Sequence, residues 1–404
     1  MSAPDWDVIV IGAGPAGALA AHQLARCQLR VLLVEKRAFP RWKVCGSCLN
    51  GVALRALEEA GLGHLVGDLG AVPLGRIRLG LQGRQLDLAL PAGRSLSRGR
   101  LDLALCEAAV AAGAVLRSPC EATVARSHPG GREVLLRSGA DVQITSARVV
   151  LVATGLGSPG LGRAGLGRVG LGRIGLGRAG LGPDLPIETR ISPWARIGAG
   201  CELDAGVSGY GRGTIHMAIG RYGYVGLVRN EAGALNLAAA FDRPHLIAAG
   251  GPASCAAAVL AEAGFDPLPE AAAATWRATP ALTRRCKPLA AERVLLLGDA
   301  AGYVEPFTGE GMGWALVGAL AVVPLVLQGQ REWQRSMERE WSRRHARLIG
   351  SRQRFCHGLA FTLRRPGLSR GLLAAAGRWP ALTAPLLQHL DGASCQRITP
   401  EPCP

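Results

Sequence analysis

The stretch DVIVIGAGPAGALAAHQLAR, residues 7–26, decides the fold of this chain. Its opening residues are apolar and lead into Gly12, which is the pattern of a buried parallel strand that ends in a turn. Gly12, Gly14 and Gly17 stand in the spacing G-x-G-x-x-G, and the alanine-rich run after them predicts a helix. A second apolar run, RVLLVE, ends at Glu35, so this region predicts one βαβ unit of the Rossmann type.

Each part of this unit has a role in binding a dinucleotide. The glycine after the strand permits the tight turn, Gly14 lets the backbone approach the diphosphate, and Gly17 lets the helix lie against the strand. Pro15 and Ala16 begin the helix, whose free N–H groups and positive dipole end bind phosphate oxygens. Glu35 ends the second strand, where its carboxylate accepts hydrogen bonds from ribose hydroxyls. This fingerprint does not separate FAD from NAD.

The segment VLLLGDAAGYVEPFTGEGMGWAL, residues 294–316, bears on the choice between these cofactors. A buried strand delivers Gly298 and Asp299 to its carboxyl end, where ligands bind in open α/β sheets. Asp299 can accept hydrogen bonds from a polyol such as the ribityl chain of a flavin. The small residues of TGEGM, 308–312, then begin a helix whose free N–H groups stabilise the negative charge of a reduced flavin. The sequence therefore favours FAD.

Two segments need an interpretation of their own. Residues 311–329 carry no charge and approach the length of a membrane span, but three glycines and Pro324 interrupt them, so we predict a buried helix. Residues 155–182 repeat the five-residue unit GLG-[SR]-x, which cannot bury a face of its own. We expect 155–183 to be a flexible surface insertion.

Five segments then carry a family pattern, in the order in which they occur: GAGPAG (12–17), FPRWKVCG (39–46), SRGRLDLAL (97–105), GRYGYVGLV (220–228) and GDAAGYVEPFTGEGM (298–312). They resemble the flavoprotein hydroxylase superfamily typified by para-hydroxybenzoate hydroxylase, and most of all its geranylgeranyl reductase-like branch. The resemblance implies an FAD domain that is interrupted by a β-sheet substrate domain and followed by helices. One departure is Thr154-Gly155, where the family usually has Asp-Gly, a pair linked to flavin and pyridine-nucleotide handling.

The resemblance also implies roles for single residues. Arg98 would lie near the phosphates and ribityl chain, Asp299 would hold the ribityl chain, and Gly309 to Met312 would approach the isoalloxazine. The residues that we expect to bind FAD are Gly12, Gly14, Pro15, Ala16, Gly17, Glu35, Lys36, Arg41, Cys45, Gly46, Arg98, Gly298, Asp299, Pro306, Gly309, Gly311 and Met312.

The predicted fold class is α/β, with a Rossmann-type FAD-binding domain, an inserted antiparallel β-sheet substrate domain and C-terminal helices. Further strands are predicted at 148–154 and 293–299, a helix at 98–113, and an antiparallel sheet in 187–240. We assign 1–75, 98–154 and 280–330 to the FAD-binding domain, 76–97 and 187–279 to the substrate domain, and 331–404 to a C-terminal helical region.

Cys45 and Cys48, in KVCGSCLN (43–50), are open to three interpretations. C-x-x-C allows a redox dithiol, poised by Lys43 and Arg41. Zinc would need a second pair at a suitable spacing, and the sequence has none, so no metal site is predicted. We favour a loop that packs against FAD, with Cys45 as the candidate catalytic residue on the flavin side.

The reaction is less sharply defined by sequence, because one scaffold of this kind serves several chemistries. We expect an FAD-dependent oxidoreductase that acts on a hydrophobic or aromatic small molecule, with reduction of an isoprenoid or lipid double bond as one such reaction and NADPH or NADH as electron donor. The alternatives are an FAD-dependent monooxygenase and a flavin-binding protein without catalysis. A halogenase is disfavoured because the chain has no W-x-W pair.

The charge of +16 is almost wholly arginine and suits phosphate-bearing ligands or an anionic membrane. Residues 331–378 hold twelve arginines among aromatic and aliphatic residues, so a peripheral membrane contact through basic C-terminal helices is one expectation. No nucleic-acid module is recognisable. The eleven scattered cysteines and the lack of a secretory signal favour a reducing cytoplasm.

Overall fold

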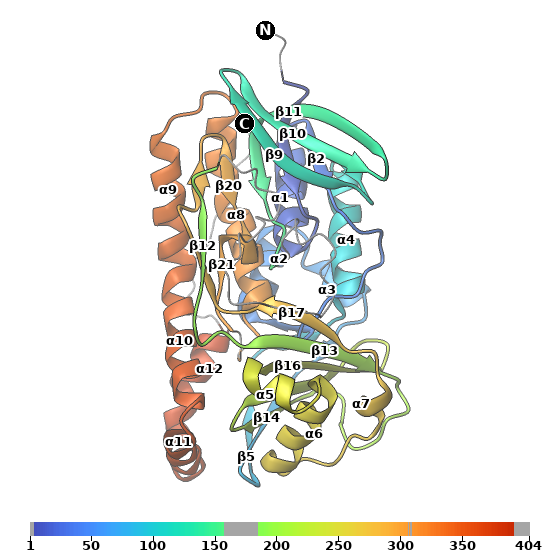
Figure 1. Cartoon of the computed structure of the whole chain (residues 1–404), viewed down its shortest axis with the longest axis vertical. Helices are drawn as coiled ribbons and strands as arrows, with labels where there is room; N and C mark the ends of the chain where they lie inside the picture. Colours follow the sequence, from blue (N-terminus) through green and yellow to red (C-terminus); the bar gives the residue numbers. More distant parts are fainter. Residues whose placement is uncertain (1–3, 157–184, 306, 308, 392–404) are drawn as a thin grey trace.

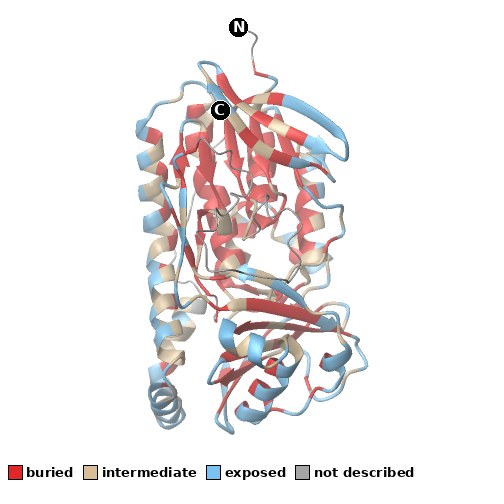
Figure 2. Cartoon of the chain, in the orientation of Figure 1, coloured by how far each residue is buried: buried red, intermediate tan, exposed pale blue. Residues whose placement is uncertain are grey.

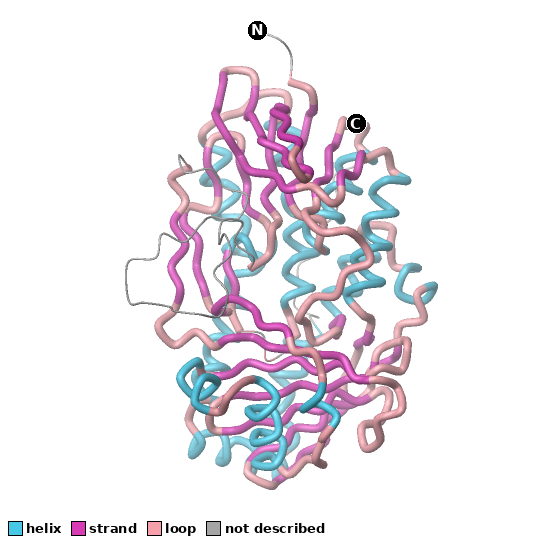
Figure 3. The backbone as a smooth tube through the Cα atoms, turned by 45° about the vertical axis from the view of Figure 1, so that its right-hand side comes forward, coloured by secondary structure: helices cyan, strands magenta, loops and turns pink. Residues whose placement is uncertain are grey.

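The computed structural model describes residues 4–156, 185–305, 307 and 309–391. Two large sheets lie one above the other along the longest axis of the molecule, with helices beside them (Figures 1 and 3). Most of the predicted 155–183 insertion lies outside the described residues, as does Pro306.

The first sheet grows from the predicted βαβ unit. β1 (Trp6–Ile11) pairs in parallel with β2 (Val31–Val34) on one side and with β11 (Asp141–Val152) on the other. The sheet continues to β8 (Val115–Arg117) beyond β2, and to β20 (Val294–Leu296) and β19 (Ala290–Ala291) beyond β11. The four predicted parallel strands are thus confirmed, although β11 begins at Asp141, earlier than expected, because its first half pairs with a hairpin.

Different elements cover the two faces of this sheet. The side chains of Val8, Val10 and Leu151 pack among three helices, α1 (Pro15–Arg26), α4 (Arg98–Ala111) and α8 (Gly311–Gly329). On the other face, Ile9 and Val150 pack against the hairpin of β9 (Glu121–His128) and β10 (Gly131–Ser138). The result is a three-layer domain whose central strands are buried on both sides (Figure 2).

Helix α8 confirms the prediction of a buried helix. It is the one helix in the described part of the chain that is long and apolar enough to cross a membrane, and 78% of its most apolar window is buried inside the protein. It runs through Pro324 without ending there. Its apolar length is therefore explained by burial between α1, α2 and the sheet.

The second sheet has seven strands in the order β17-β13-β16-β15-β14-β5-β6. The strands are β5 (Arg76–Leu81), β6 (Arg84–Ala89), β13 (Ile197–Leu203), β14 (Thr214–Gly220), β15 (Gly223–Arg229), β16 (Leu235–Phe241) and β17 (Arg277–Ala281). All pairings are antiparallel except β14 with β5, which is parallel. The prediction of an antiparallel sheet is correct apart from this one pair, which joins segments far apart in sequence. Helices α5 (Arg243–Ala248), α6 (Pro252–Ala263) and α7 (Glu270–Ala273) accompany this sheet.

Two small sheets connect the large ones. One contains β3 (Cys48–Asn50), β7 (Gly93–Ser95) and β4 (Val72–Pro73), and the other contains β12 (Glu188–Ile191), β18 (Arg284–Lys287) and β21 (Gly302–Tyr303). Helices α2 (Gly51–Glu59) and α3 (His64–Asp68) follow β3.

The chain after α8 is helical, as predicted. Helices α9 (Ser336–His345) and α10 (Ser351–Leu363) are joined by a π-helical turn, and α11 (Pro366–Arg378) and α12 (Ala384–Asp391) follow. α9 to α11 run down one side of the molecule, and α12 returns toward α2 (Figure 1).

Candidate functional site

One cavity of about 450 Å³ runs from the glycine fingerprint of the first sheet to the face of the second sheet. It receives Gly12 and Gly14 from the end of β1, Asp299 from the segment after β20, and Met312 from the first turn of α8. Its other end is formed by β5, β6, β14 and β15. The cavity therefore lies at the carboxyl ends of the parallel strands, where ligands bind in sheets of this kind.

Most of the expected FAD-binding residues line this cavity. They are Gly12, Gly14, Pro15, Ala16, Glu35, Lys36, Cys45, Gly46, Arg98, Gly298, Asp299, Gly309, Gly311 and Met312. Gly17 and Arg41 lie behind the lining, Gly17 against the backbone of Gly12 and Arg41 against Glu35 and Asp102. Pro306 lies outside the described residues.

The three fingerprint glycines have the surroundings that the sequence predicts: a tight turn at Gly12, an open backbone at Gly14 and close packing at Gly17. Gly12 has a φ of +102° and sits so close to Ala153 that a Cβ there would lie 2.5 Å from the Ala153 carbonyl oxygen. A Cβ on Gly17 would lie 1.8 Å from the Gly12 oxygen. Gly14 is different, because a Cβ there would meet only the tips of Arg98 and Arg41, at 3.6 and 4.0 Å. Its backbone is thus the open floor of the cleft.

Three cations gather beside Gly14, and two are fixed by buried carboxylates. Arg98 donates to both oxygens of Asp102, at 2.8 and 2.9 Å, and Arg41 reaches Asp102 at 3.0 Å and Glu35 at 3.2 Å. Although burial disfavours its charge, Asp102 and Cys45 raise the pKa of Arg98 above its usual value. Burial, together with Arg98 and Arg41, lowers the pKa of the third cation, Lys43, to about 8.

Glu35 lies buried at the nucleotide end of the cleft. One carboxylate oxygen accepts hydrogen bonds from Ala13 N at 3.1 Å and Arg41 at 3.2 Å, and the other accepts from Arg37 N at 3.2 Å. These contacts fix the carboxylate at the edge of the cavity. The second oxygen accepts only one of these three bonds, and a carboxylate oxygen has room for two. Glu35 can therefore still accept a ribose hydroxyl.

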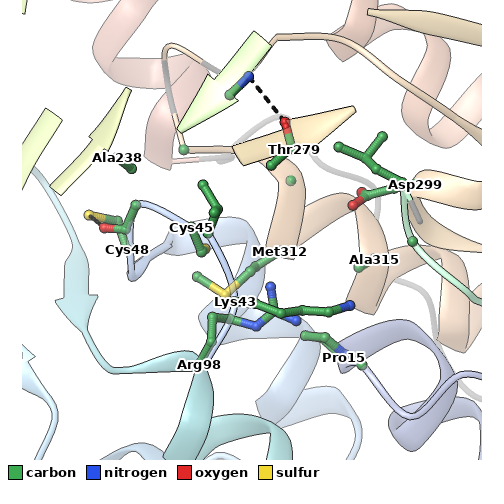
Figure 4. Close-up of a pocket in the computed structure, with 18 of the residues that line it drawn as sticks. Pro15, Lys43, Cys45, Cys48, Arg98, Ala238, Thr279, Asp299, Met312 and Ala315 are labelled. Atoms are coloured by element: carbon green, nitrogen blue, oxygen red, sulfur yellow. Dashed lines mark hydrogen bonds between the residues drawn. The ribbon is translucent and has the colours of Figure 1, made fainter. Parts of the chain in front are cut away.

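Cys45 lies where the two halves of the cavity meet. Its sulfur lies near the Arg98 guanidinium, whose pKa it helps to raise, and its backbone oxygen accepts a hydrogen bond from Asn236 of β16 at 2.8 Å. Figure 4 shows the side chains of Cys45, Met312, Lys43 and Arg98 gathered in the cleft, with Asp299 facing them. Burial raises the pKa of Asp299, and Lys43 and Arg98 partly offset this effect.

Cys48 has a different environment from Cys45. Both are free cysteines, and the Cys48 thiol donates to the Gly46 oxygen at 3.0 Å. Burial, and then the neighbouring Cys45, raise the pKa of Cys48 far above its usual value. The attacking sulfur in thiol–disulfide exchange must be a thiolate, so this environment disfavours Cys48 as the attacking thiol of a redox pair.

The first turn of α8 is held by an ion pair that sequence reasoning did not find. The buried Glu310 carboxylate accepts hydrogen bonds from Trp314 and from Arg352 of α10, both at 2.8 Å, and lies 3.2 Å from His389 of α12. Burial alone would raise the pKa of Glu310, but hydrogen bonds from His389 and Arg352 hold it below its usual value. The pair fixes α12 at the cavity, which Leu386 and Leu387 line.

Other lining residues were also missed. Lys43, Trp42 and Thr154 lie around the cofactor end, and Tyr224, Tyr303 and Phe307 lie around the far end. Lys43 and Trp42 stand inside the quoted segment FPRWKVCG, so that segment carried a signal for them. Tyr224 stands inside the quoted segment GRYGYVGLV, and Tyr303 and Phe307 stand inside GDAAGYVEPFTGEGM. Neither segment could indicate that Tyr224 and Phe307 meet, with ring centroids 5.3 Å apart, because they are 83 residues apart in sequence.

The residues present fit FAD. The open floor at Gly14 and the cations beside it suit a diphosphate, and the buried Asp299 suits the hydroxyls of a ribityl chain. The first turn of α8, with Gly311 and Met312 in the cavity wall, presents free N–H groups to the space beyond Asp299.

The pH dependence of FAD binding should reveal Lys43. Its pKa is about 8 in the folded cleft and 10.5 in the unfolded chain, so the protein without FAD gains stability as the pH rises across this window. Diphosphate binding favours the charged form, so we expect FAD affinity to be complete below pH 8 and to fall above it, by up to about tenfold per pH unit. The other charged groups that act on Lys43 are Arg98, Arg41, Asp102 and Glu35.

FAD affinity is measured by fluorescence titration at values between about pH 6.5 and about pH 9.5. This range lies on both sides of the Lys43 pKa of about 8. Lys43→Met should flatten the profile, whereas Lys36→Met, at the exposed rim, should leave it unchanged. Equal slopes in the two variants would show that another group titrates.

Comparison with known proteins agrees with this geometry. Residues 5–174 match a family model described as an FAD binding domain. Menaquinone reductase of Mycobacterium tuberculosis is 33% identical over 159 residues, which are 38% of this chain and 38% of that protein. Digeranylgeranylglycerophospholipid reductase 1 of Methanopyrus kandleri is 33% identical over 164 residues, which are 38% of this chain and 40% of that protein. The chain thus spans about two fifths of the length of these relatives.

A solved structure extends the likeness to the whole fold. The flavin-dependent brominase Bmp2 superposes with a TM-score of 0.72, covering 98% of this chain and 96% of that chain, at 16% sequence identity. At this identity the likeness is one of architecture.

Proposed function

This chain is a flavoprotein of the para-hydroxybenzoate hydroxylase-like superfamily, and from that premise we propose that it is an FAD-dependent reductase that saturates a carbon–carbon double bond in a large apolar molecule of isoprenoid type. The observation that carries the proposal is the chemistry of the cavity wall beyond Cys45. There the second sheet presents Ile77, Leu79, Leu88, Ile215, Met217 and Leu227, all apolar.

The wall offers little to orient a small polar substrate. Sites for small molecules usually place a few polar groups that fix the orientation of the ligand. The polar side chains that the second sheet contributes here are Tyr224, Thr279 and Arg277, and Arg277 lies exposed at one edge, where it donates to the Trp42 oxygen. Binding would then come from burial of apolar area, at roughly 25 cal/mol per Å².

The relatives support the same substrate class. One is named a menaquinone reductase and another a digeranylgeranylglycerophospholipid reductase, and both names describe reduction of a lipid-soluble molecule. Because each match covers 38% of this chain, the activity of the whole protein remains our proposal.

Cys45 is the proposed proton donor. When bound and reduced, FAD supplies a hydride to one carbon of the double bond. The other carbon needs a proton, and the Cys45 S–H lies at the junction between cofactor end and apolar wall. Because the sulfur lies near Arg98, the negative charge that develops as the proton leaves is stabilised by a guanidinium. Solvent then returns a proton to the sulfur.

The remaining residues of the site bind FAD and exclude water. Lys43 and Arg98 neutralise the diphosphate, Arg41 adds positive charge from behind the lining, and Asp299 holds the ribityl chain. The apolar side chains Leu386 and Leu387 exclude water from the reacting bond. We propose NADPH or NADH as the electron donor, since the large arginine excess suits the phosphates of either nucleotide.

The test is an anaerobic turnover experiment with the purified full chain. FAD absorbance is followed on addition of NADPH or NADH, then a quinone with an unsaturated polyprenyl chain is added and its mass is measured. We expect flavin reoxidation coupled to a gain of two hydrogen atoms per double bond. Gain of an oxygen atom only after air is admitted would identify a monooxygenase. Flavin that stays reduced until air oxidises it, with the polyprenyl chain unchanged in mass, would favour a flavin-binding protein without this catalysis.

A further inference from the structure

The last described helices have an unusual charge distribution. Residues 341–390 contain nine arginines and no aspartate or glutamate. Three of these arginines bind the body of the protein: Arg344 donates to the Ala321 oxygen of α8 at 3.1 Å, Arg352 pairs with Glu310, and Arg364 pairs with Glu305 at 3.1 Å and Asp242 at 3.0 Å. Arg365, Arg370 and Arg378 are exposed on or beside α11. This end of the molecule is therefore a cationic surface.

The same segment also exposes large apolar side chains. Phe361, Leu368, Leu372, Trp379 and Leu382 are each between 52% and 61% exposed, and they make up five of the thirteen large hydrophobic residues that the described part of the chain exposes. Figure 2 shows α11, beside the second sheet, largely in the colour of exposed residues. Isolated exposed leucines need no explanation, but a group of this size within 22 residues marks an interaction site.

This surface adjoins the cavity of the proposed active site. On α10, Leu359 and Leu363 pack against Ile77, Leu79 and Leu88, the side chains that form the apolar wall. After α11 the chain turns back through α12, whose Leu386 and Leu387 line the cavity itself. One continuous segment thus carries exposed apolar side chains on its outside and cavity-lining side chains on its inside.

We propose that α10 to α12 dock onto the surface of a lipid bilayer that contains anionic lipids. Leucine and tryptophan side chains would enter the boundary between headgroups and acyl chains, and Arg365, Arg370 and Arg378 would pair with lipid phosphates. The docked helices place the cavity wall at the membrane surface, where a lipid-soluble substrate would enter. The docking itself rests on this surface and not on the reductase chemistry.

Two other binding partners, a second copy of this chain and a nucleic acid, fit this positively charged surface less well. A second copy of this chain would bring the same arginines to the contact, with Asp391 as the single carboxylate of α10 to α12, so mostly like charges would face each other. A nucleic acid would satisfy the arginines but would leave the leucines of α11 in water.

Vesicle sedimentation with the full chain tests the proposal. Protein is mixed with vesicles of phosphatidylcholine alone or with phosphatidylglycerol added, and pelleted protein is measured on a gel, so the result does not depend on flavin or turnover. We expect binding to the anionic vesicles that weakens as salt is raised. The double variant Leu368→Ser/Leu372→Ser should lower the partition coefficient by about tenfold or more. The variant Arg370→Gln/Arg378→Gln should lower it by about tenfold on anionic vesicles only.

Matched controls lie at the opposite end of the long axis, on the three paired strands β9, β10 and β11 (Figure 1). Val142 and Ile144 are 55% and 63% exposed, and Arg126 and Arg137 are also exposed. Val142→Ser/Ile144→Ser and Arg126→Gln/Arg137→Gln should bind as the parent does. Equal loss in the control variants, no binding to anionic vesicles, or a dimer in solution that the Leu368→Ser/Leu372→Ser variant dissociates would each overturn the proposal. Vesicle binding without reductase activity would support the docking and contradict the proposed function alone.

Discussion

Gly17→Ala is expected to unfold the FAD-binding domain, whereas Gly14→Ala should leave it folded and abolish most FAD binding. The Cβ of an alanine at 17 would lie 1.8 Å from the Gly12 oxygen, a backbone atom that itself sits against Ala153. Neither β1 nor α1 can move without disrupting the buried sheet, so we expect a loss above about 4 kcal/mol, at the upper end for single substitutions. Thermal and urea unfolding measure it.

At Gly14 the same methyl group meets no backbone atom. Its nearest neighbours are the ends of Arg98 and Arg41, so the fold is retained. The methyl group would occupy the floor on which the diphosphate lies, and we expect FAD affinity to fall by about a hundredfold, or about 2.7 kcal/mol. Gly67→Ala on the surface of α3, where a Cβ meets nothing within 4 Å, is the matched control and should change neither quantity. A folded Gly17→Ala variant with normal FAD content would contradict the role of this glycine.

These glycines show which parts of the site a sequence can predict. The turn, the helix start and the acidic strand end all lie within residues 12–35, so local spacing and backbone sterics are enough to predict them. The same holds for Asp299 and Met312, which one strand–turn–helix segment brings to the cleft. The fold class followed from these two segments because parallel strands align their carboxyl ends at one edge.

Local spacing could not predict the contacts between segments that are far apart in the sequence. Glu310 was read as part of a helix start, yet its partners come from α10 and α12, 42 and 79 residues later. Arg41 was expected to bind FAD, but it lies behind the lining because Asp102 and Glu35, from two other elements, hold it there. The parallel pairing of β5 with β14 likewise depends on how the whole second sheet assembles, since hydrophobic alternation is the same in either direction.

Cys45→Ala should lower kcat for double-bond reduction by about 10²- to 10⁴-fold, the usual contribution of a positioned proton donor. FAD content and the rate of flavin reduction by the nicotinamide should stay near the parent values, because Arg98, the diphosphate residue near Cys45, remains fixed by its two hydrogen bonds to Asp102. Rapid-mixing absorbance separates the two half-reactions. Cys48→Ala is the matched control: its thiol donates to the Gly46 oxygen, and its loss should change kcat by less than about threefold.

The source of the transferred proton distinguishes this role from the redox dithiol. A dithiol needs both sulfurs, so Cys45→Ala and Cys48→Ala would then lose turnover equally, and thiol titration of the parent would change with its redox state. A proton donor needs Cys45 alone. In heavy water the parent should place one deuterium on the carbon that does not receive the hydride, with a solvent isotope effect on kcat. In Cys45→Ala the residual reduction should depend on added buffer acid, because a small acid can enter the space left by the thiol. If turnover survives that substitution without loss, the proton comes from another group, and Tyr303, whose burial raises its pKa well above the usual value, is the lining residue to replace next.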